Sequence, residues 1–454
     1  MSIISNALSG SMAAQAALGA ASQNIANLQT PGYTRQGVLL SSLGAGVGVR
    51  SAGNGVEVSS LLRFADAYKS QQMWRSASDQ GARSQTQPYL TQLERIMGDE
   101  SSSISNGIDG FFTALNAAAV DPTSTPLRQQ IITAADAMSQ HFNSISNVMN
   151  NQLLSVHQQR DAIMPQANAA LANIAALNQR ISTSTAAGTN VSALMDARDQ
   201  LIDGLASQMA LEVTDQPDGS RDISLKSGQP LVIGSIAGTL SSNTTGTGEQ
   251  TLSLKFAKST FTLDNVAVGG QLGGLGDFER NTLQPLQKSI QDLASTLSTK
   301  VNAQLAAGKT MTGNVGGPLF IYANGTLSIT KNFTAADLAL AATDGAAGDS
   351  KNLQSLINIK NDSVDVEWVG KVLISDADTQ LVGKLGIYSQ QNQSLLKTAD
   401  TVRTQAVNDW KSTSAVNKDE EAMSLVEFQN MYQANMKVIS VANALFDATL
   451  QMMG

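Results

Sequence analysis

The chain has 454 residues, a formal net charge of -8 and no cysteine. This length allows two or three domains, and the lack of cysteine excludes disulfides, thiolate catalysis and cysteine metal sites. The 29 Lys and Arg residues form no basic run, which argues against nucleic-acid binding. No stretch suits a membrane span, and the N-terminus lacks the pattern of a cleaved secretory signal. We therefore expect a cytoplasmic protein, or export by a route that reads another signal.

The N-terminal segment is predicted to be a helix over residues 3–27, with Ser2 as its N-cap. Gly10 and Gly19 each weaken it by about 1 kcal/mol relative to Ala, so we expect it to fray without a partner. Apolar residues at helical spacing lie beside small ones: Ile4, Leu8, Leu18 and Ile25, next to Ala7, Ala14, Ala17 and Ala21. Thr30-Pro31-Gly32-Tyr33 then predicts a type II turn, because Pro fixes φ at the second position and Gly allows a positive φ at the third.

The next segments change from a strand-like to a helical pattern. Residues 37–58 predict short strands or an extended loop, and helical spacing starts at Ser60. Thr125-Pro126 is a strong helix start, and the helix that follows is expected to continue past a kink at Pro165. Further helices are predicted from their apolar spacing: one that ends at Asp121-Pro122, then 191–209, 283–305 and 381–410.

Strand-like alternation predicts a small β subdomain over residues 211–275, inserted between helices. Its clearest run alternates apolar and polar residues: Leu252, Ser253, Leu254, Lys255 and Phe256. Its last part, Gly269–Gly276, is predicted to be a flexible joint because glycine is frequent there. Residues 308–376 are mixed, with glycine-rich loops, short strands and short helices.

The C-terminal segment carries the clearest apolar pattern. A polar break at Lys411–Lys418 precedes it, and Asn417 is predicted to cap the last helix. One stripe falls on steps of four and three: Leu425, Tyr432, Met436, Ile439, Phe446, Leu450 and Met453. A second runs beside it: Met431, Val438, Ala442, Leu445 and Met452. Such spacing lines a helix face that packs lengthwise on another helix. A seam at each end of the chain favours an assembly subunit; ordinary core packing of two surface helices is the alternative.

Residues that could do chemistry are few. His141 and His157 lie far apart on one long predicted helix, and each is expected to be solvent-facing or partly buried. Three carboxylates share a helix with Arg198: Asp196, Asp199 and Asp203. Paired carboxylates can serve as acid and base, but we expect an exposed charged helix face. Gly44, Gly46 and Gly48 form a glycine-rich loop, but no Lys-Ser/Thr pair follows them as it does in a phosphate-binding loop. No catalytic, metal or cofactor site is predicted.

Motifs near the two ends of the chain resemble those of one protein family. Ser22–Asn27 and the turn Thr30–Arg35 resemble the N-terminal motif of bacterial flagellar rod, hook and hook-associated proteins, and Glu427–Asn435 resembles their C-terminal motif. The residues of the turn motif are Asn24, Asn27, Thr30, Pro31, Gly32 and Tyr33. Thr34-Arg35 after the turn is closer to the hook-associated proteins than to the hook protein, which typically has Gly-Phe-Lys there. Leu194–Ile202 resembles a helix motif of the hook-associated proteins.

The resemblance implies a structural subunit that joins hook to filament by polymerising through its terminal helices. Together with the residue patterns, it implies a mainly α fold with a smaller β subdomain. Residues 1–40 and 411–454 would form a coiled-coil inner tube. The elongated helical bundle would consist of residues 41–210 and 276–410, and the β subdomain of residues 211–275. The assembly seam is then Ile4, Leu8, Leu18, Ile25, Leu425, Tyr432, Met436, Ile439, Phe446 and Leu450. The chain is short for the family, which implies that a large outer domain of some members is reduced or missing.

The implied partners are copies of the same chain, the hook protein, the next hook-associated junction protein and, before export, a cytoplasmic chaperone at the C-terminal region. The implied location is the extracellular hook–filament junction, reached through the flagellar type III channel without a cleaved signal. No enzymatic activity, cofactor, nucleic acid or membrane insertion is implied. Two alternatives stay open: another axial component, such as a hook or distal-rod protein, and a helical ligand-binding protein or enzyme, which would need a concave site with converging polar groups.

Overall fold

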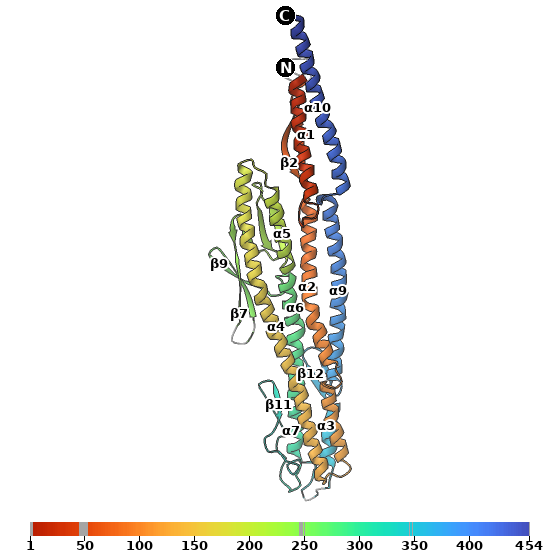
Figure 1. The fold of residues 1–454 in the computed structure, drawn as a ribbon. Helices are drawn as coiled ribbons and strands as arrows, with labels where there is room; N and C mark the ends of the chain where they lie inside the picture. The colour runs from red at the N-terminus through yellow and green to blue at the C-terminus, as the bar shows by residue number, and fades with distance from the viewer. Residues whose placement is uncertain are drawn as a thin grey trace.

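The computed structural model describes residues 3–44, 53–244, 248, 250–344, 346 and 348–453. Its helices lie lengthwise in an elongated body, with small antiparallel sheets beside them and both chain ends at the same tip (Figure 1). This arrangement confirms the predicted fold class, mainly α with a smaller β region and paired terminal helices. Within the described ranges, no helix combines the length and apolarity needed to cross a membrane.

The terminal helices α1 (Ile3–Ala26) and α10 (Lys418–Met453) pack side by side beyond the rest of the molecule (Figure 1). α1 matches the predicted helix, whose proposed cap Ser2 lies outside the described residues. A hairpin of β1 (Gln36–Ser42) and β2 (Val56–Arg63) packs against α1. The strands predicted after the turn are therefore present, while Gly46 and Gly48 also lie outside the described residues.

The polar break before the last helix is shorter than predicted. α9 (Ala377–Ser414) includes the first part of the break, and only Ala415–Asn417 separates it from α10. Asn417 caps α10 as predicted, because its Oδ1 accepts a hydrogen bond from the Asp419 amide at 3.1 Å. The terminal pair is thus connected to the body by one very short segment on this side.

The body is built from long helices: α2 (Ala67–Met97) along α9, with α3 (Ile104–Ala118), α4 (Thr125–Ala186), α5 (Ser192–Gln208) and α7 (Gln284–Ala307). The predicted helical start at Ser60 is wrong, because β2 occupies that position. α2 begins after Asp66, whose carboxylate accepts a hydrogen bond from the Lys69 amide. α4 has Pro126 in its first turn, as predicted, and continues unbroken through Pro165.

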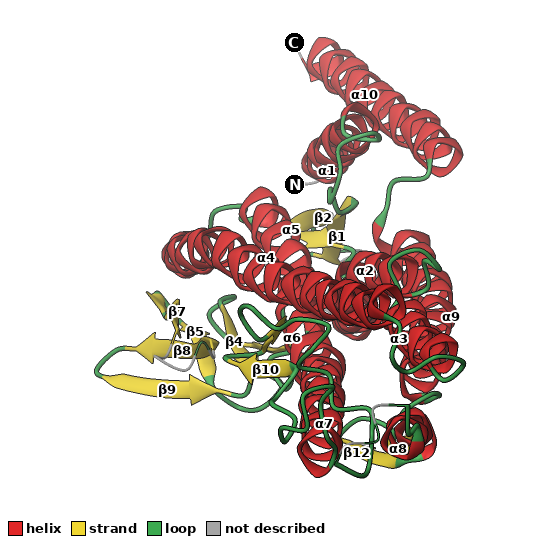
Figure 2. Ribbon diagram, turned by 90° about the horizontal axis from the view of Figure 1, so that it is seen from below, coloured by secondary structure: helices red, strands yellow, loops and turns green. Residues whose placement is uncertain are grey.

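The predicted β region forms two small antiparallel sheets beside α4 (Figures 1 and 2). Four strands form the first: β3 (Leu211–Asp215), β4 (Arg221–Leu225), β5 (Pro230–Ile233) and β6 (Ile236–Ala237). Three form the second: β7 (Thr239–Thr244), β8 (Gln250–Phe256) and β9 (Ser259–Leu263). Leu252 and Leu254 point into the core and Lys255 is exposed, which is the alternation that the sequence predicts.

The glycine-rich segment predicted to be a flexible joint is instead a packed helix, α6 (Gly270–Phe278), followed by a π-helical turn, Glu279–Leu283. A Cβ on Gly274 would clash with the backbone of Ala82 in α2, and a Cβ on Gly276 would clash with the carbonyl oxygen of Asn265. These glycines allow close backbone approach rather than motion, so the prediction of a joint there was wrong.

The mixed segment 308–376 lies at the end of the body away from the chain termini (Figure 1). It contains two hairpins and short helices, as predicted: β10 (Phe320–Ala323), β11 (Thr326–Ile329), β12 (Ser363–Val366), β13 (Gly370–Leu373), α8 (Lys351–Asn358) and the 3-10 turn Ile359–Asn361. Phe320 packs edge-on against Phe111 of α3. The long helices and these hairpins therefore share one hydrophobic core.

Candidate functional site: the terminal helices and their joint

The contact between α1 and α10 is made by small residues on α1. The buried residues of α1 are Ala7, Ser11, Ala13, Ala14, Ala17, Ala21 and Asn24. The half-buried residues of α10 include a series at steps of three and four: Leu425, Phe428, Tyr432, Asn435, Ile439 and Ala442. Ser11 Oγ lies 3.7 Å from Met436 Sδ. Small side chains let the two helices approach closely, and they leave the larger apolar residues outside the contact.

The predicted seam residues divide into two groups. Leu18 and Ile25 of α1, with Leu425, Tyr432 and Ile439 of α10, are half-buried. The others are exposed, with these exposed fractions: Ile4 43%, Leu8 49%, Met436 44%, Phe446 62% and Leu450 54%; of these, Met436 still contacts Ser11 of α1 through its sulfur. One part of the predicted seam therefore lies within the chain's own helix pair, and the other part is exposed apolar surface of the kind that marks an interaction site.

The turn motif is held by the side chain of Asn24, which is 1% exposed. Its amide nitrogen donates to the Gln36 carbonyl at 2.8 Å, and its oxygen accepts from the Gln36 amide at 3.0 Å and the Tyr33 hydroxyl at 2.9 Å. Gly32 has φ 74°, and the Tyr33 amide donates to the Thr30 carbonyl at 3.2 Å. These features confirm the predicted turn, in which Asn24 serves as the central hydrogen-bonding group.

The other turn residues support the same conformation from the outside. Thr30 Oγ1 donates to Asn27 Oδ1 at 3.1 Å, and Asn27 Nδ2 donates to the Gln23 carbonyl at 2.9 Å. Pro31 is exposed. The motif is therefore a short structural element that redirects the chain from α1 into the β1–β2 hairpin.

The turn is fastened to the body by carboxylates of α5. The Thr34 amide donates to Asp196 Oδ2 at 3.1 Å, and the guanidinium of Arg63 binds Asp196 at 2.7 Å and Asp199 at 2.9 Å. These three charged side chains are only 11 to 17% exposed, and Arg221 of β4 binds Asp199 from the other side. The predicted exposed charged face is thus wrong here: Asp196 and Asp199 form the core of a buried ion-pair network.

Other elements of the joint hold the terminal pair to α9. The Arg35 amide donates to the Ser414 carbonyl at 2.8 Å, and its guanidinium binds Glu420 at the start of α10 at 2.7 Å. Asp203, the third carboxylate of α5, binds Arg403 of α9 at 2.7 Å. The joint therefore connects α1, α5, α9 and α10 by charged and backbone contacts.

Burial changes the acidity of two groups in the joint. It raises the pKa of Tyr33 to about 12, with a further contribution from the negative charges of Asp196 and Glu421. It lowers the pKa of Arg198 to about 10, a change that Asp199 opposes. Both changes follow from removing the charged form from water.

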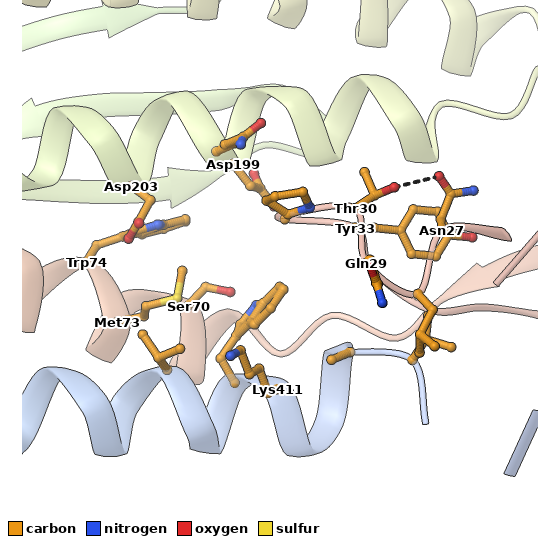
Figure 3. A pocket seen from close by; sticks show the side chains of 18 of the residues that line it. Asn27, Gln29, Thr30, Tyr33, Ser70, Met73, Trp74, Asp199, Asp203 and Lys411 are labelled. Carbon is orange, nitrogen blue, oxygen red and sulfur yellow. Dashed lines mark hydrogen bonds between the residues drawn. The ribbon is translucent and has the colours of Figure 1, made fainter. Parts of the chain in front are cut away.

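A cavity of about 480 Å³ lies beside the turn, between α2, α5 and α9 (Figure 3). Its apolar walls come from Leu28, Met73, Trp74, Val407, Trp410 and Val416, and its polar lining includes Asp203, Arg403 and Lys411. Two of the chain's three tryptophans line it. The Trp74 side chain is 3% exposed, and its indole Nε1 finds no hydrogen-bond partner among the described residues.

The histidines do not form a catalytic site. His141 is half-buried. His157 is buried, contrary to expectation, and its Nε2 lies 3.0 Å from Glu279, which also binds the fully buried Arg160 at 2.5 Å. Such a compact set of buried charges ties α4 to the π-helical turn. Within the described ranges, no three His, Asp or Glu side chains are grouped to hold a metal ion.

Several residues of the joint could not be singled out in the sequence. Arg63 and Arg221 are lone arginines at strand ends, and Trp74 and Trp410 lie in unrelated helices. The one available signal was the spacing of the three carboxylates on α5 at steps of three and four, which marks one helix face. The sequence shows that face but does not show that basic residues from β2, β4 and α9 cover it.

Comparisons with known proteins give one consistent result. The model of the flagellar hook-associated protein FlgK helical domain matches residues 90–320, and the model of the flagellar basal body rod FlgEFG protein C-terminal region matches residues 412–452. Flagellar hook-associated protein 1 of Salmonella typhimurium (strain LT2) is 28% identical over 561 residues, covering 99% of each chain. That of Bacillus subtilis is 23% identical, covering 97% of this chain and 96% of the relative.

A solved structure shares the fold. The flagellar hook junction protein FlgK from Burkholderia pseudomallei has a TM-score of 0.66 at 17% identity, and it covers 75% of this chain and 100% of that structure. The Salmonella alignment spans 561 positions against 454 residues here. The relative thus carries residues that this chain lacks, in agreement with the predicted short length.

Proposed function

Since the chain belongs to the family of the flagellar hook-associated protein FlgK, we propose that it joins hook to filament by polymerising through its two terminal helices. It is a structural component of the bacterial flagellum, located outside the cell at the hook–filament junction, in a family of structural proteins rather than enzymes. What we propose is the mechanism, in which polymerisation through the terminal helices joins hook to filament.

The observation that carries this proposal is the exposed apolar surface on both terminal helices. The α1–α10 contact uses small residues, while Ile4, Leu8, Phe446 and Leu450 stay exposed. Exposed apolar patches on adjacent helices are surfaces for further helices. In the assembly, α1 and α10 of many copies would pack lengthwise into an inner tube.

The position of the terminal pair fits a layered assembly. Seen along the molecule, α1 and α10 lie to one side of the body (Figure 2). Copies stacked through these helices can keep their bodies in a second, outer layer, with the β sheets farther out. We propose the following division: residues 1–40 and 411–454 in the inner tube, 41–210 and 276–410 in the outer helical layer, and 211–275 as the β subdomain.

The interface between copies is proposed to be heterologous, so that one surface of each copy meets a different surface of the next. Repetition of such a contact builds a helical or ring-shaped layer. The hook protein would lie on one side of this layer and the next hook-associated junction protein on the other. Assembly with flagellar hook and filament proteins follows from the family; the particular neighbours belong to this proposal.

Before export, the same apolar face of α10 requires cover. We propose that a cytoplasmic flagellar export chaperone binds it, with the amphipathic helix seated in an apolar groove. Met436, Phe446 and Leu450 of this stripe are exposed on that helix, which supports this mode. Export without a cleaved signal would follow through the flagellar type III channel.

The alternatives have less support. A hook or distal-rod protein would share the match over residues 412–452, but the helical-domain match over 90–320 is to the hook-associated protein. A ligand-binding protein or enzyme would use the joint cavity, whose charged residues Asp203 and Arg403 bind each other. The fold and both matches favour the assembly protein.

The proposal is tested by deleting the gene and imaging the cells by electron microscopy. We expect hooks without filaments and flagellin released into the medium. Complementation with the intact chain, carrying an internal tag in an exposed loop of the β region, should restore filaments and place the tag between hook and filament. Normal filaments in the deletion strain would contradict the proposed function.

A further inference from the structure

α10 extends well beyond its partner helix. α10 has 36 residues and α1 has 24. Because the helices are antiparallel and Ser11 lies opposite Met436, the start of α1 at Ile3 lies near Ala444. The rest of α10 then continues for about 13 Å at a rise of about 1.5 Å per residue, without α1 beside it. We call this part, residues 445–453, the overhang.

The overhang continues the apolar stripe that packs on α1. Phe446 and Leu450 follow Ile439 and Ala442 at steps of three and four, so they point to the same side of the helix. Leu445, Phe446, Leu450 and Met452 are 54 to 81% exposed. A helix stripe that is covered along most of its length and bare at its end indicates that another chain covers that end.

The joint cavity lies at the opposite end of the terminal pair. Its volume of about 480 Å³ is in the range of about 300–1,000 Å³ that is typical of binding pockets. Leu28 and Pro31 at its rim are exposed, so the cavity is accessible. Tryptophan is rare in this chain, with three residues, and two of them line this cavity. Aromatic pockets of this kind are typical centres of protein interfaces.

We propose that the overhang of one copy inserts Phe446 and Leu450 into the joint cavity of a second copy. This inference rests on the proposed polymerisation and specifies its contact. The bare stripe is apolar and the cavity walls are apolar. A helix that continues past α1 must meet the turn end of the next terminal pair in the stack, where the cavity is located.

Charge at the two surfaces agrees with this pairing. Asp447 is exposed on the overhang, next to Phe446. Lys411 lines the cavity, is exposed, and forms no ion pair within the described ranges. The last turn of an α-helix also has carbonyl groups without helical partners, which a cation stabilises. The cavity thus offers a cation to an incoming helix end.

The geometry also determines the type of assembly. The overhang and the cavity lie at opposite ends of one terminal pair, so no copy can fill its own cavity. A contact between them is heterologous and leaves a free overhang and a free cavity on every dimer. It therefore extends from copy to copy, as an axial layer requires.

The test uses cysteine cross-linking, since the chain has no cysteine of its own. Leu450→Cys is combined with Val407→Cys in one chain, expressed in the deletion strain, and purified flagella are oxidised. We expect a ladder of covalent dimers, trimers and larger species. Each single variant should give none. The control combines Leu450→Cys with Thr404→Cys, one turn along α9 on an exposed position outside the cavity, and should not give a ladder.

Absence of a ladder in flagella that carry filaments and contain the protein would overturn the insertion while leaving the proposed function intact. Absence of the protein from filament-bearing junctions would instead contradict the proposed function. If the variant with both cysteines fails to assemble, an exchange of charges between the two surfaces is the second test. Lys411→Glu and Asp447→Lys should each reduce the number of filaments. The variant that carries both charge changes should restore the number. No restoration, or no loss from either single variant, would also overturn the insertion.

Discussion

The Thr34 backbone amide donates a hydrogen bond to the carboxylate of Asp196, at a sequence separation of 162 residues. Thr34 is fully buried and follows the family's turn motif directly, and Asp196 lies on a helix of the body. Through this contact and the shared Arg63, the path of the chain out of α1 is fixed by α5. The orientation of the terminal pair therefore depends on a few buried polar groups.

Asp196→Ala should destabilise the protein by about 2 kcal/mol, because it leaves the buried Thr34 amide without its acceptor and takes one of two carboxylates from Arg63, which keeps Asp199. The measurement is urea unfolding, with the change read from the midpoint at constant slope. Asp215→Asn is the control: its side chain is 57% exposed although it also binds an arginine, so a loss of about 0–1 kcal/mol is expected. Equal losses for the two variants would contradict a buried network at the joint.

Ile439→Asp should abolish filament assembly without changing the stability of the body. Ile439 is half-buried in the α1–α10 contact, and a carboxylate placed there without a partner either opens the contact or becomes protonated. The body is separated from this contact by the joint, so its thermal unfolding should stay the same. Filaments are counted by electron microscopy, and secreted and cytoplasmic protein are compared to separate export from assembly.

Lys437→Glu is the matched control for Ile439→Asp, since Lys437 is exposed two residues away on the same helix. Its effect on filament number should be mild. Normal filaments with Ile439→Asp would show that the terminal helices do not pack as proposed.

Gly274→Ala should destabilise the body by about 1–3 kcal/mol, the usual cost of forcing an extra methyl group into a packed contact. Its Cβ would meet the backbone of Ala82. Gly110→Ala is the control, because it is an exposed helical glycine with open space around its Cβ position; there a gain of about 0.5–1 kcal/mol is expected. Thermal unfolding of both variants distinguishes a packed helix from a flexible segment, in which neither change would matter.

Alkaline pH should weaken the joint between about pH 10 and 12. The pKa of Tyr33 is raised from 10.0 to about 12 in the folded protein. Below pH 10 the Tyr33 hydroxyl is protonated in both the folded and the unfolded state, so its contribution to the free energy of unfolding is fully present. Between about pH 10 and 12 the hydroxyl loses its proton mainly in the unfolded state, and the free energy of unfolding falls. Stability is measured against pH for the intact chain and for Tyr33→Phe, which has no proton to lose. The decline should be steeper for the intact chain, and parallel curves would contradict the assignment to Tyr33.

The helices and the turn could be predicted because their signals are local. The apolar stripe from Leu425 to Ile439 and the Pro31-Gly32 turn depend on helical spacing and on the φ preferences of two residues, and both agree with the structure. The polar break predicted at Lys411–Lys418 was too long, because Lys411–Ser414 is polar but still helical in α9.

Predictions were wrong where the outcome depends on residues distant in sequence. Gly269–Gly276 was interpreted as flexible, since nothing nearby shows that Ala82 lies against it. Asp196 and Asp199 were interpreted as solvent-exposed, since their arginines are on other elements. For the predicted assembly seam, the sequence identified the apolar faces of the two helices. It did not show which apolar side chains of α10 would be covered by α1. Tertiary contacts decide whether a glycine or a charged side chain is buried, and these contacts cannot be predicted from a single sequence.

The helix α4 gives the body a mechanical character. Its 62 residues form one helix, about 93 Å long at a rise of about 1.5 Å per residue. Pro165 has no N–H and removes one hydrogen bond from the ladder, but the helix continues through it. The joint, by contrast, connects through Ala415–Asn417 and the turn after α1. Under the torque of a rotating flagellum, deformation should concentrate at that joint, while the body tilts as a stiff unit relative to the terminal helix pair.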